Sequence, residues 1–250
     1  MKFTYDAYKN LILLLKEHNY VFCSYADYGK YDKSVIMRHD VDRDLEKALV
    51  FSEIERDLGI SATYSILVTS EFYNVFSRRN RELLNAIYEN GQYIGLHFDE
   101  AQYDKTERDW WKKAIDDELS LLEKCVGRKI DNVSMHRVSK EALEEDWKIQ
   151  GGKVINNYGK EFMQNHKYVS DSRRNWREDV IELVKKGQYN RFHMLIHPGW
   201  YDEKERTTKE ILRSFCRGQV YKCYDELDKN IRDLSELLDR SELSDGGEAE

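Results

Sequence analysis

Residues 35–42 read VIMRHDVD, a short apolar run that closes with two aspartates separated by one valine. Six further runs of apolar or β-branched residues follow it, and longer amphipathic segments lie between them. The seven runs cover residues 35–42, 61–68, 92–99, 131–137, 153–158, 168–172 and 192–198. Strands that alternate with helices in this way are typical of βα units around a parallel sheet. The sequence therefore predicts an α/β protein.

Apolar stripes predict helices in two of the remaining segments. One stripe recurs at spacings of three and four residues, as a single buried helix face requires, and consists of Trp111, Ile115, Leu119, Leu122 and Val126. Gly127 then stands where a C-cap glycine is expected. A second stripe, over residues 224–238, predicts a packing helix, with the seam of a coiled-coil dimer as the alternative.

The length of the chain fits one large domain. Its 250 residues match the roughly 250 that are typical of a single α/β barrel, and no segment rich in proline or glycine divides them. We expect one domain over residues 1–240. Residues 241–250 are polar and acidic and contain two glycines, so we expect a disordered tail there.

Charge and composition exclude several classes of protein. The net charge of −7 argues against a nucleic-acid partner, since phosphate binding needs a concentrated basic face. No stretch approaches the roughly 18 apolar residues of a membrane span, and residues 1–20 lack the apolar region and cleavage site of a signal peptide. The four cysteines form no CxxC pair, which favours a reducing compartment. We therefore expect a cytoplasmic protein, whose oligomeric state the sequence leaves open.

Polar residues stand at the ends of five predicted strands, where the active sites of parallel α/β proteins lie. In chain order by strand, they are Arg38, His39, Asp40 and Asp42; His97 and Asp99; His136 and Arg137; Asp171; and His197. Because Asp40 and Asp42 are two residues apart, both carboxylates face one side of an extended strand. Two carboxylates held together favour a shared cation or a raised pKa on one of them. The alternative is that Asp42 or Asp44 caps the helix that follows.

Histidines on the same predicted rim strengthen the case for a cation. A lone histidine in an apolar stretch, such as His97, is more often a core residue with a hydrogen-bond partner than a ligand. The odds change because Asp40, Asp42, His136 and His197 are all expected on the same rim. Oxygen and imidazole groups together suit zinc or a related divalent ion.

These residues, taken in chain order, resemble the motifs of the polysaccharide deacetylase (NodB-homology) family. The matching positions are Asp40-Val41-Asp42, His97, His136-Arg137, Asp171 with Trp176, and Leu195-Ile196-His197. The resemblance covers about residues 35–200 and each motif is weak by itself, so their order carries the match. It implies a distorted (β/α)7 barrel of the TIM type in a single domain.

The resemblance also implies a divalent metal ion, with zinc as the first candidate, bound by Asp42 and His97. Asp40 resembles the catalytic base that activates a water molecule, and Arg137 resembles the arginine that orients this base. If Asp40 is a solvent-facing carboxylate it contributes little to folding. We therefore expect Asp40→Asn to remove turnover and to leave the thermal midpoint almost unchanged.

The opposite side of the expected site would hold the acid and the substrate. Asp171 resembles the residue that tunes the base or the acid, and His197 resembles the histidine that protonates the departing amine. Leu195 resembles the leucine that lines the acetyl pocket. Trp176 and Trp200 are expected to contact the substrate.

Two positions depart from the family pattern. Ala101 stands four residues after His97, where the family has its second metal-binding histidine, and Ser139 stands where it has a proline. His136 lies at a neighbouring strand end and is our candidate for the missing ligand. However, His136 and Arg137 are successive residues, and both cannot point inward without a local twist of the strand.

The leading hypothesis is a metal-dependent hydrolase that deacetylates an N-acetylated sugar or a glycan precursor. One alternative is a pseudoenzyme that keeps the scaffold and binds a carbohydrate or a protein partner without turnover. A third is an enzyme of another class on the same scaffold, with phosphate-ester or acyl chemistry, since one fold hosts many functions.

Overall fold

A computed structural model describes residues 1–243 of the chain. The chain divides into two compact units, Met1–Lys204 and Glu205–Glu250, which we describe separately. The predicted boundary at residue 240 remains a prediction. Of the expected tail, residues 244–250 lie outside the described part, and residues 241–243 belong to a 3-10 turn, η6 (Arg240–Leu243).

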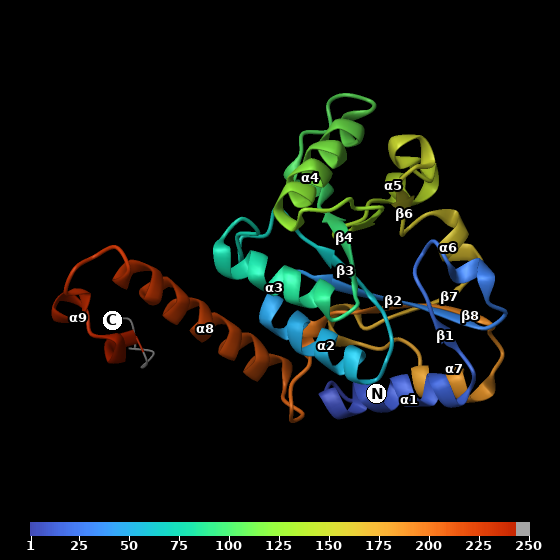
Figure 1. Cartoon of the computed structure of the whole chain (residues 1–250), viewed down its shortest axis with the longest axis horizontal. Coiled ribbons are helices and arrows are strands. Elements are labelled where there is room, and N and C mark those ends of the chain that lie inside the picture. The colour runs from blue at the N-terminus through green and yellow to red at the C-terminus, as the bar shows by residue number, and fades with distance from the viewer. Residues whose placement is uncertain (244–250) are drawn as a thin grey trace. The chain divides into compact units, whose positions relative to one another are not determined.

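The first unit is built on one parallel sheet (Figure 1). Its strands are β1 (Val21–Phe22), β2 (Ser34–Val41), β3 (Thr63–Ile66), β4 (Tyr93–Phe98), β5 (Asn132–Met135), β6 (Ile155–Asn156), β7 (Lys167–Ser170) and β8 (Arg191–Ile196). Seven of them pair in the order β6-β5-β4-β3-β2-β8-β7. The strands from β2 to β8 therefore follow one another around a ring in chain order, and β8 returns to pair with β2. Among the described residues β6 does not pair with β7, so the ring is open there. The predicted (β/α)7 barrel is confirmed, and it is distorted because one seam is open.

All seven predicted strand regions contain a strand, and β1 is the one that the sequence analysis missed. β1 is only two residues long and pairs with Ser34 and Val35 at the start of β2. The last four residues of β2, from Arg38 to Val41, pair with β3 instead. A strand this short carries too few residues to show an apolar period.

Helices surround the sheet (Figure 1). They are α1 (Tyr5–Glu17), α2 (Leu45–Asp57), α3 (Arg78–Glu89), α4 (Trp110–Val126), α5 (Lys140–Glu145), α6 (Lys160–Gln164) and α7 (Val180–Lys186). Neighbouring helices contact one another: α1 with α7, α2 with α3, and α3 with α4. The prediction for α4 is confirmed, and Gly127 ends this helix with φ of 69°, a left-handed conformation that glycine adopts without a steric penalty.

The alternation of side chains along β2 decides what lies inside the barrel. All eight residues of this strand are buried, because helices cover its outer face and the other strands surround its inner face. Val35, Met37 and Val41 join the main hydrophobic core between the sheet and the helices. Arg38 and Asp40 belong to the other face, so a buried charged pair lies inside the barrel.

The second unit contains α8 (Thr208–Asp228), α9 (Leu234–Leu237) and η6. One continuous helix over the stripe at residues 224–238 is therefore a wrong prediction. The Asn230 side chain donates to the carbonyl of Glu226 just past the end of α8, and Asp233 has a positive φ of 57°. Tyr224 and Leu234 are buried, and the Tyr224 hydroxyl donates to the Leu238 carbonyl. The chain folds back here, and the apolar spacing does not mark one helix face.

Along residues 1–243, no helix combines the length and the apolar character that a membrane crossing needs.

Candidate metal and hydrolase site

Three side chains from different strand ends meet at the carboxyl edge of the sheet. Asp42 Oδ1 lies 3.3 Å from His97 Nε2 and 3.3 Å from His136 Nδ1, and the two ring nitrogens are 3.1 Å apart. His97 is buried at 1% exposure, whereas the side chains of Asp42 and His136 are 29% and 27% exposed. The group is therefore fixed in the protein at one end and open to solvent at the other.

Local structure explains why each of the three points here. Asp42 follows β2 directly, and the capping role that was its alternative belongs to Asp44, whose carboxylate accepts the Lys47 backbone N–H at the start of α2. His97 lies on β4. The His136 backbone N–H donates to the Phe98 carbonyl at 2.8 Å, which extends the β4–β5 pairing by one residue and carries His136 to the site.

The donor set and its spacing fit a divalent cation. One carboxylate oxygen and two imidazole nitrogens are the mixed ligands that zinc and related ions take. A tetrahedral ion with bonds of 2.0 to 2.2 Å holds its ligand atoms roughly 3.3 to 3.6 Å apart, close to the 3.1 and 3.3 Å between these atoms. Asp42, His97 and His136 form a group that could hold a metal ion.

The charge state of Asp42 supports this reading. Burial acts to raise the pKa of its carboxyl group, but the interactions with His136 and His97 outweigh burial and hold the pKa well below its ordinary value. The pKa of His136 is raised, first of all by its interaction with Asp42. Asp42 is thus a carboxylate at any ordinary pH and offers a negative charge to a cation.

A second set of contacts orients His97. Its Nδ1 lies 2.7 Å from Ser134 Oγ, and this hydroxyl lies 3.4 Å from Asp40 Oδ1. If Nδ1–H donates to Ser134 and the hydroxyl donates to Asp40, the lone pair of His97 Nε2 faces Asp42 and His136. Metal-binding histidines commonly have their other ring nitrogen held in this way. Ser134 was missed in the sequence, although it lies two residues before His136 and so shares its face of β5.

Asp40 is buried, and an arginine of its own strand holds it. Asp40 is 3% exposed, so the expectation of a solvent-facing carboxylate is wrong. Arg38 Nε lies 3.1 Å from Asp40 Oδ1, and Arg38 Nη2 lies 3.3 Å from Oδ2 and donates to the Tyr158 hydroxyl at 2.9 Å. Burial acts to lower the pKa of Arg38, but Asp40 outweighs it and the net shift is upward. The guanidinium of Arg38 therefore stays charged although it is fully buried.

Arg137 does not have the contact that the family resemblance implied. Its guanidinium is 56% exposed and pairs with both oxygens of Asp99, with Nε donating to Oδ1 at 3.0 Å. The reason is the alternation that the sequence already suggested: His136 turns toward Asp42, and the next residue turns away. In this structure Arg38, not Arg137, contacts Asp40.

The structure brings Asp171 and His197 together on the other side of the site. His197 Nδ1 lies 2.6 Å from Asp171 Oδ1, and the His197 backbone N–H donates to both oxygens of this carboxylate at 3.1 and 3.2 Å. Asp171 is fully buried. Burial acts to lower the pKa of His197, but the charge of Asp171 outweighs it and raises the pKa to about 9.

A small hollow separates these two sides. Residues Asp40 to Asp44 line it from one side and residues His197 to Gly199 from the other, and its volume is about 10 Å³. This is about the room that one water molecule needs. A water held here would lie between the candidate base and the candidate acid.

The three residues that were expected to contact the substrate lie in different surroundings. Leu195 is 1% exposed and lies beside Arg38 in the β2–β8 register, below the hollow. Trp176 is partly buried and packs against the main core. Trp200 lies near the rim, where the Arg43 guanidinium covers its ring at 4.0 Å and donates to the Gly199 carbonyl.

The position of Ala101 matches its departure from the family pattern. It lies in the 3-10 turn η2 (Glu100–Gln102), is exposed, and gives its backbone N–H to Asp99 Oδ1. The described residues that could hold a metal ion therefore include His136 and nothing from this turn.

Comparison with known proteins finds similarity only among solved structures. No family model and no curated protein matches it. Solved structures that resemble it include a CE4 family pseudoenzyme from Bacillus anthracis (15% identity, TM-score 0.47, 76% of this chain), of whose length the chain spans about three-fifths (62%). Another is the Streptococcus pyogenes deacetylase PplD in complex with acetate (11% identity, TM-score 0.45, covering 84% of this chain and 85% of that one). A third is the peptidoglycan deacetylase PdaC from Bacillus subtilis (16% identity, TM-score 0.44, covering 73% of this chain and 83% of that one). One of these three neighbours is thus described as a CE4 family pseudoenzyme and two as deacetylases, all at low sequence identity.

Proposed function

We propose that this protein is a metal-dependent hydrolase that removes the acetyl group from an N-acetylated sugar. The observation that carries the proposal is the convergence of the three possible ligands Asp42, His97 and His136 with a held carboxylate on one side and a protonated imidazole on the other. The chemistry that needs all of these groups is attack of water on an acyl carbon, followed by protonation of a leaving group.

Asp42, His97 and His136 would hold the divalent ion. When bound, such an ion polarises a carbonyl oxygen and makes water more acidic. The buried hydrogen-bond chain from His97 through Ser134 to Asp40 links the ligand set to the base, so both are fixed by the same strands.

Asp40 is the group that takes the proton from the attacking water. The carboxylate lies beside the Arg38 guanidinium, with Arg38 Nε 3.1 Å from Asp40 Oδ1. Arg38 also fixes the direction of the carboxylate, since its Nη2 is anchored on the Tyr158 hydroxyl. A base held in place loses little entropy when the water molecule reacts.

His197 is the group that gives a proton to the departing nitrogen. Its pKa of about 9 means that the ring is protonated at neutral pH, and Asp171 holds its Nδ1 so that Nε2–H is free to donate. Water adds to the acyl carbon, the C–N bond breaks, and the nitrogen takes the proton from His197. The products are acetate and an amine.

The sugar as substrate rests on the motif resemblance, and the acyl chemistry rests on the geometry. The pseudoenzyme alternative is favoured by one observation, the hollow of only about 10 Å³ between base and acid. An enzyme must admit an acetamido group there, so the walls have to move when substrate binds. A protein that only binds a sugar has no such need.

Turnover on N-acetylated sugars, measured as released amine, tests the proposal. The protein is freed of metal with a chelator and then reloaded with zinc, cobalt or manganese. We expect amine release that depends on the added metal, and at least a 100-fold loss of kcat in Asp42→Asn. Asp32→Asn is the matched control, because Asp32 is exposed and outside the site. Metal binding without any amine release would contradict the hydrolase and support the pseudoenzyme.

A further inference from the structure

The segment that joins β7 to α7 carries a concentration of positive charge that the chemistry proposed above does not use. Residues 172–177 read SRRNWR and contain three arginines and no acidic residue, in a chain whose net charge is −7. The segment begins directly after Asp171, the carboxylate that holds His197. Its positive charge therefore lies next to the candidate site.

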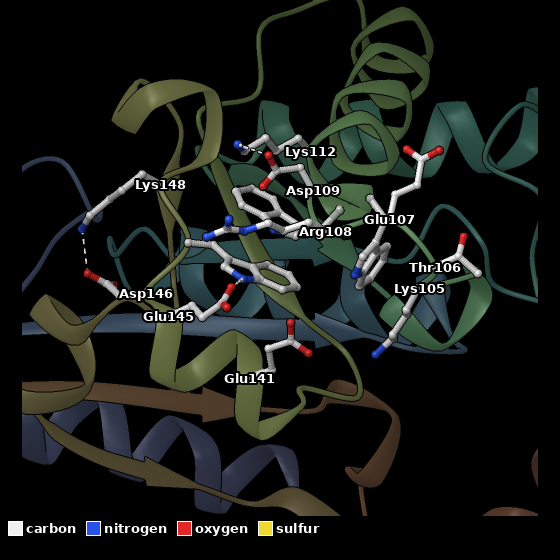
Figure 2. A pocket seen from close by; sticks show the side chains of 13 residues that line it. Lys105, Thr106, Glu107, Arg108, Asp109, Lys112, Glu141, Glu145, Asp146 and Lys148 are labelled. Carbon is white, nitrogen blue, oxygen red and sulfur yellow. Dashed lines mark hydrogen bonds and ion pairs between the residues drawn. The ribbon is translucent and has the colours of Figure 1, made fainter.

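Several basic side chains in the segments that follow β4 and β5 are in a different state, because carboxylates neutralise them. Figure 2 shows two such pairs on the walls of a hollow of about 740 Å³, Lys112 with Asp109 at 3.0 Å and Lys148 with Asp146 at 2.7 Å. An ammonium group that is already paired with a carboxylate offers little net charge to a ligand.

Arg173 and Arg177 have no such partner. Both side chains are exposed, and among residues 1–243 neither makes an ion pair, a side-chain hydrogen bond or a contact with an aromatic ring. The acidic residue that follows them, Glu178, is already paired with Lys167 at 2.6 Å. Two guanidinium groups are therefore available to an anion.

The turn that carries Arg173 is fixed on both sides. The Asn175 backbone N–H donates to the Asp171 carbonyl at 3.2 Å, and the Arg174 guanidinium lies over the ring of Phe3 at 4.8 Å. Arg173 is the exposed residue between these two anchors. Because its backbone is held, a ligand that binds the guanidinium has little loop motion to arrest.

The backbone of this turn is also strained. Arg173 and Arg174 have left-handed conformations with φ of 58° and 56°, which glycine or asparagine adopts at lower cost than arginine does. The geometry of the turn thus gives no reason for an arginine at either position. Strain of this kind is concentrated at functional sites. Since Arg174 packs on Phe3, the guanidinium of Arg173 is the group that has no role inside the protein.

The position of Arg173 limits the size of the ligand. Arg173 lies two residues after Asp171, so their Cα atoms are at most about 7 Å apart. The Asp171 carboxylate in turn lies 2.6 Å from the ring of His197. An anion at Arg173 is therefore separated from the proposed acid by a distance that a single substituted sugar covers.

Phosphate fits this arrangement better than other anions do. A guanidinium group binds either phosphate or carboxylate through two parallel N–H···O bonds. A phosphate ester, however, carries up to two negative charges and three free oxygens, so it can engage both Arg173 and Arg177. A polynucleotide needs a basic face that extends over many phosphates, and this segment offers only a short cluster.

We propose that Arg173 and Arg177 form an anion-binding subsite, which holds the phosphate of a phosphorylated sugar while the sugar ring extends toward Asp42, His97 and His136. The identity of this ring as an acetylated one rests on the proposed function, but binding of the phosphate does not. The phosphate is either a simple ester or the diphosphate that links a sugar to a nucleotide, since both present the same kind of oxygens.

Calorimetric titration of the full chain, freed of metal by dialysis against a chelator so that no turnover occurs, tests the subsite. The probes are N-acetylglucosamine, its 1-phosphate and 6-phosphate, UDP-N-acetylglucosamine and N-acetylmuramic acid. We expect a phosphorylated probe to bind about tenfold more tightly than the neutral sugar, as charge-assisted hydrogen bonds allow. Tightest binding of UDP-N-acetylglucosamine would support the subsite as one for nucleotide-linked sugars, and tightest binding of a monophosphate would support it as one for simple esters.

The gain in affinity should depend on the arginines of this segment. Arg173→Gln should remove most of it, and Arg173→Lys, which keeps the charge and loses the planar set of donors, should keep an intermediate part. Arg177→Gln should weaken binding of the same probe about threefold and keeps the test valid if Arg173→Gln does not fold. Arg81→Gln is the matched control, because Arg81 is an exposed arginine on α3, outside the segment.

Equal affinity of the phosphorylated and neutral sugars, or a gain that neither glutamine variant changes, would overturn the subsite. Tighter binding of N-acetylmuramic acid, whose anion is a carboxylate, would overturn it as well. Arg173-dependent binding without deacetylation of any probe after metal is restored would instead remove the proposed hydrolase and leave the subsite standing.

Discussion

The two faces of β2 each carry a cluster of buried polar side chains, and the two clusters differ in their access to solvent. On the inner face, Arg38 and Asp40 form a charged pair that leads to Asp42, which is 29% exposed. The inner cluster is thus continuous with solvent through the candidate metal site.

The outer face carries a closed cluster around Glu55 of α2. Its Oε1 lies 2.5 Å from His39 Nε2 and accepts the Tyr8 hydroxyl at 2.5 Å, and its Oε2 accepts the Tyr64 hydroxyl at 2.6 Å. All four side chains are fully buried. No substrate or ion can reach them, so this cluster joins β2 to α1, α2 and β3 and has no part in the chemistry.

The difference teaches that burial and charge alone do not mark a functional site. Arg38, His39 and Asp40 are successive residues and all are buried, yet His39 belongs to the structural cluster and its neighbours to the candidate site. Access to solvent separates the two clusters, and the following experiments test that separation.

The largest expected effect is on stability at the closed cluster. Glu55→Ala leaves His39 and two tyrosine hydroxyls buried without their common partner, which should lower the free energy of unfolding by about 3 to 5 kcal/mol. Chemical denaturation measures this, with Glu53→Ala on the exposed side of the same helix as the control. Metal affinity of the folded variant should stay unchanged, and a loss of affinity would break the comparison.

At the open cluster the main effect should be on metal binding. His97→Ala and His136→Ala should each weaken zinc binding about 100-fold, or about 2.7 kcal/mol, because each removes one of the three proposed ligands. Titration calorimetry measures the affinity, and His18→Ala, a histidine outside the site, is the control. Ala101→His should restore part of the affinity of His136→Ala, since position 101 is where the related motif has its second histidine. Unchanged affinity in His136→Ala would show that His136 is not a ligand.

Changes to the Arg38–Asp40 pair should affect both the stability of the fold and the activity, since the pair is buried and also belongs to the candidate site. Either Asp40→Asn or Arg38→Met alone leaves one charge of the pair unmatched inside the barrel, so we now expect each to destabilise the fold. The double variant removes both charges and should recover about 2 kcal/mol relative to the sum of the two single changes. Additive losses would mean that the pair is not coupled. In either case Asp40→Asn should lose turnover.

The smallest expected effect is a shift along the pH axis. His197 must be protonated to act as the acid, so kcat of the metal-loaded protein should fall as the pH rises through about 9. Asp171→Asn removes the charge that raises the pKa of His197, and the basic limb should move to lower pH by at least one unit, or about 1.4 kcal/mol. A limb that stays in place in this variant would show that His197 is not the titrating acid.

Much of the site could be predicted because strand ends are visible in the sequence. The runs that end at Asp42, His97 and His197 were correctly located, and parallel strands bring their carboxyl ends to one edge. Arg38 was among the polar residues at the end of the first run, but its role beside Asp40 was not predicted. Ser134 could also have been found, since it lies two residues before His136. The period of two that united Asp40 with Asp42 applies equally to Ser134 and His136.

Other features depend on contacts between segments far apart in the chain. Which of His136 and Arg137 faces the candidate metal site depends on how β5 pairs with β4, and the partner of Arg137 is Asp99 on another loop. Likewise, the rings of Trp110 and Trp111 at the start of α4 pack against Trp147, which is more than thirty positions away in the chain. No local pattern connects such positions.

The sequence by itself determined the alternation of strands and helices, and with it the α/β class, the parallel sheet and the rim on which Asp42, His97, Asp171 and His197 lie. These follow from periods of two and of three to four residues, which are local properties of the chain. The tertiary structure alone decided which buried charges face the barrel interior, that Arg38 holds Asp40, and that the seam between β6 and β7 stays open. Those outcomes depend on pairing and packing between distant segments, and the energy of a buried ion pair is set by the partner that the fold provides.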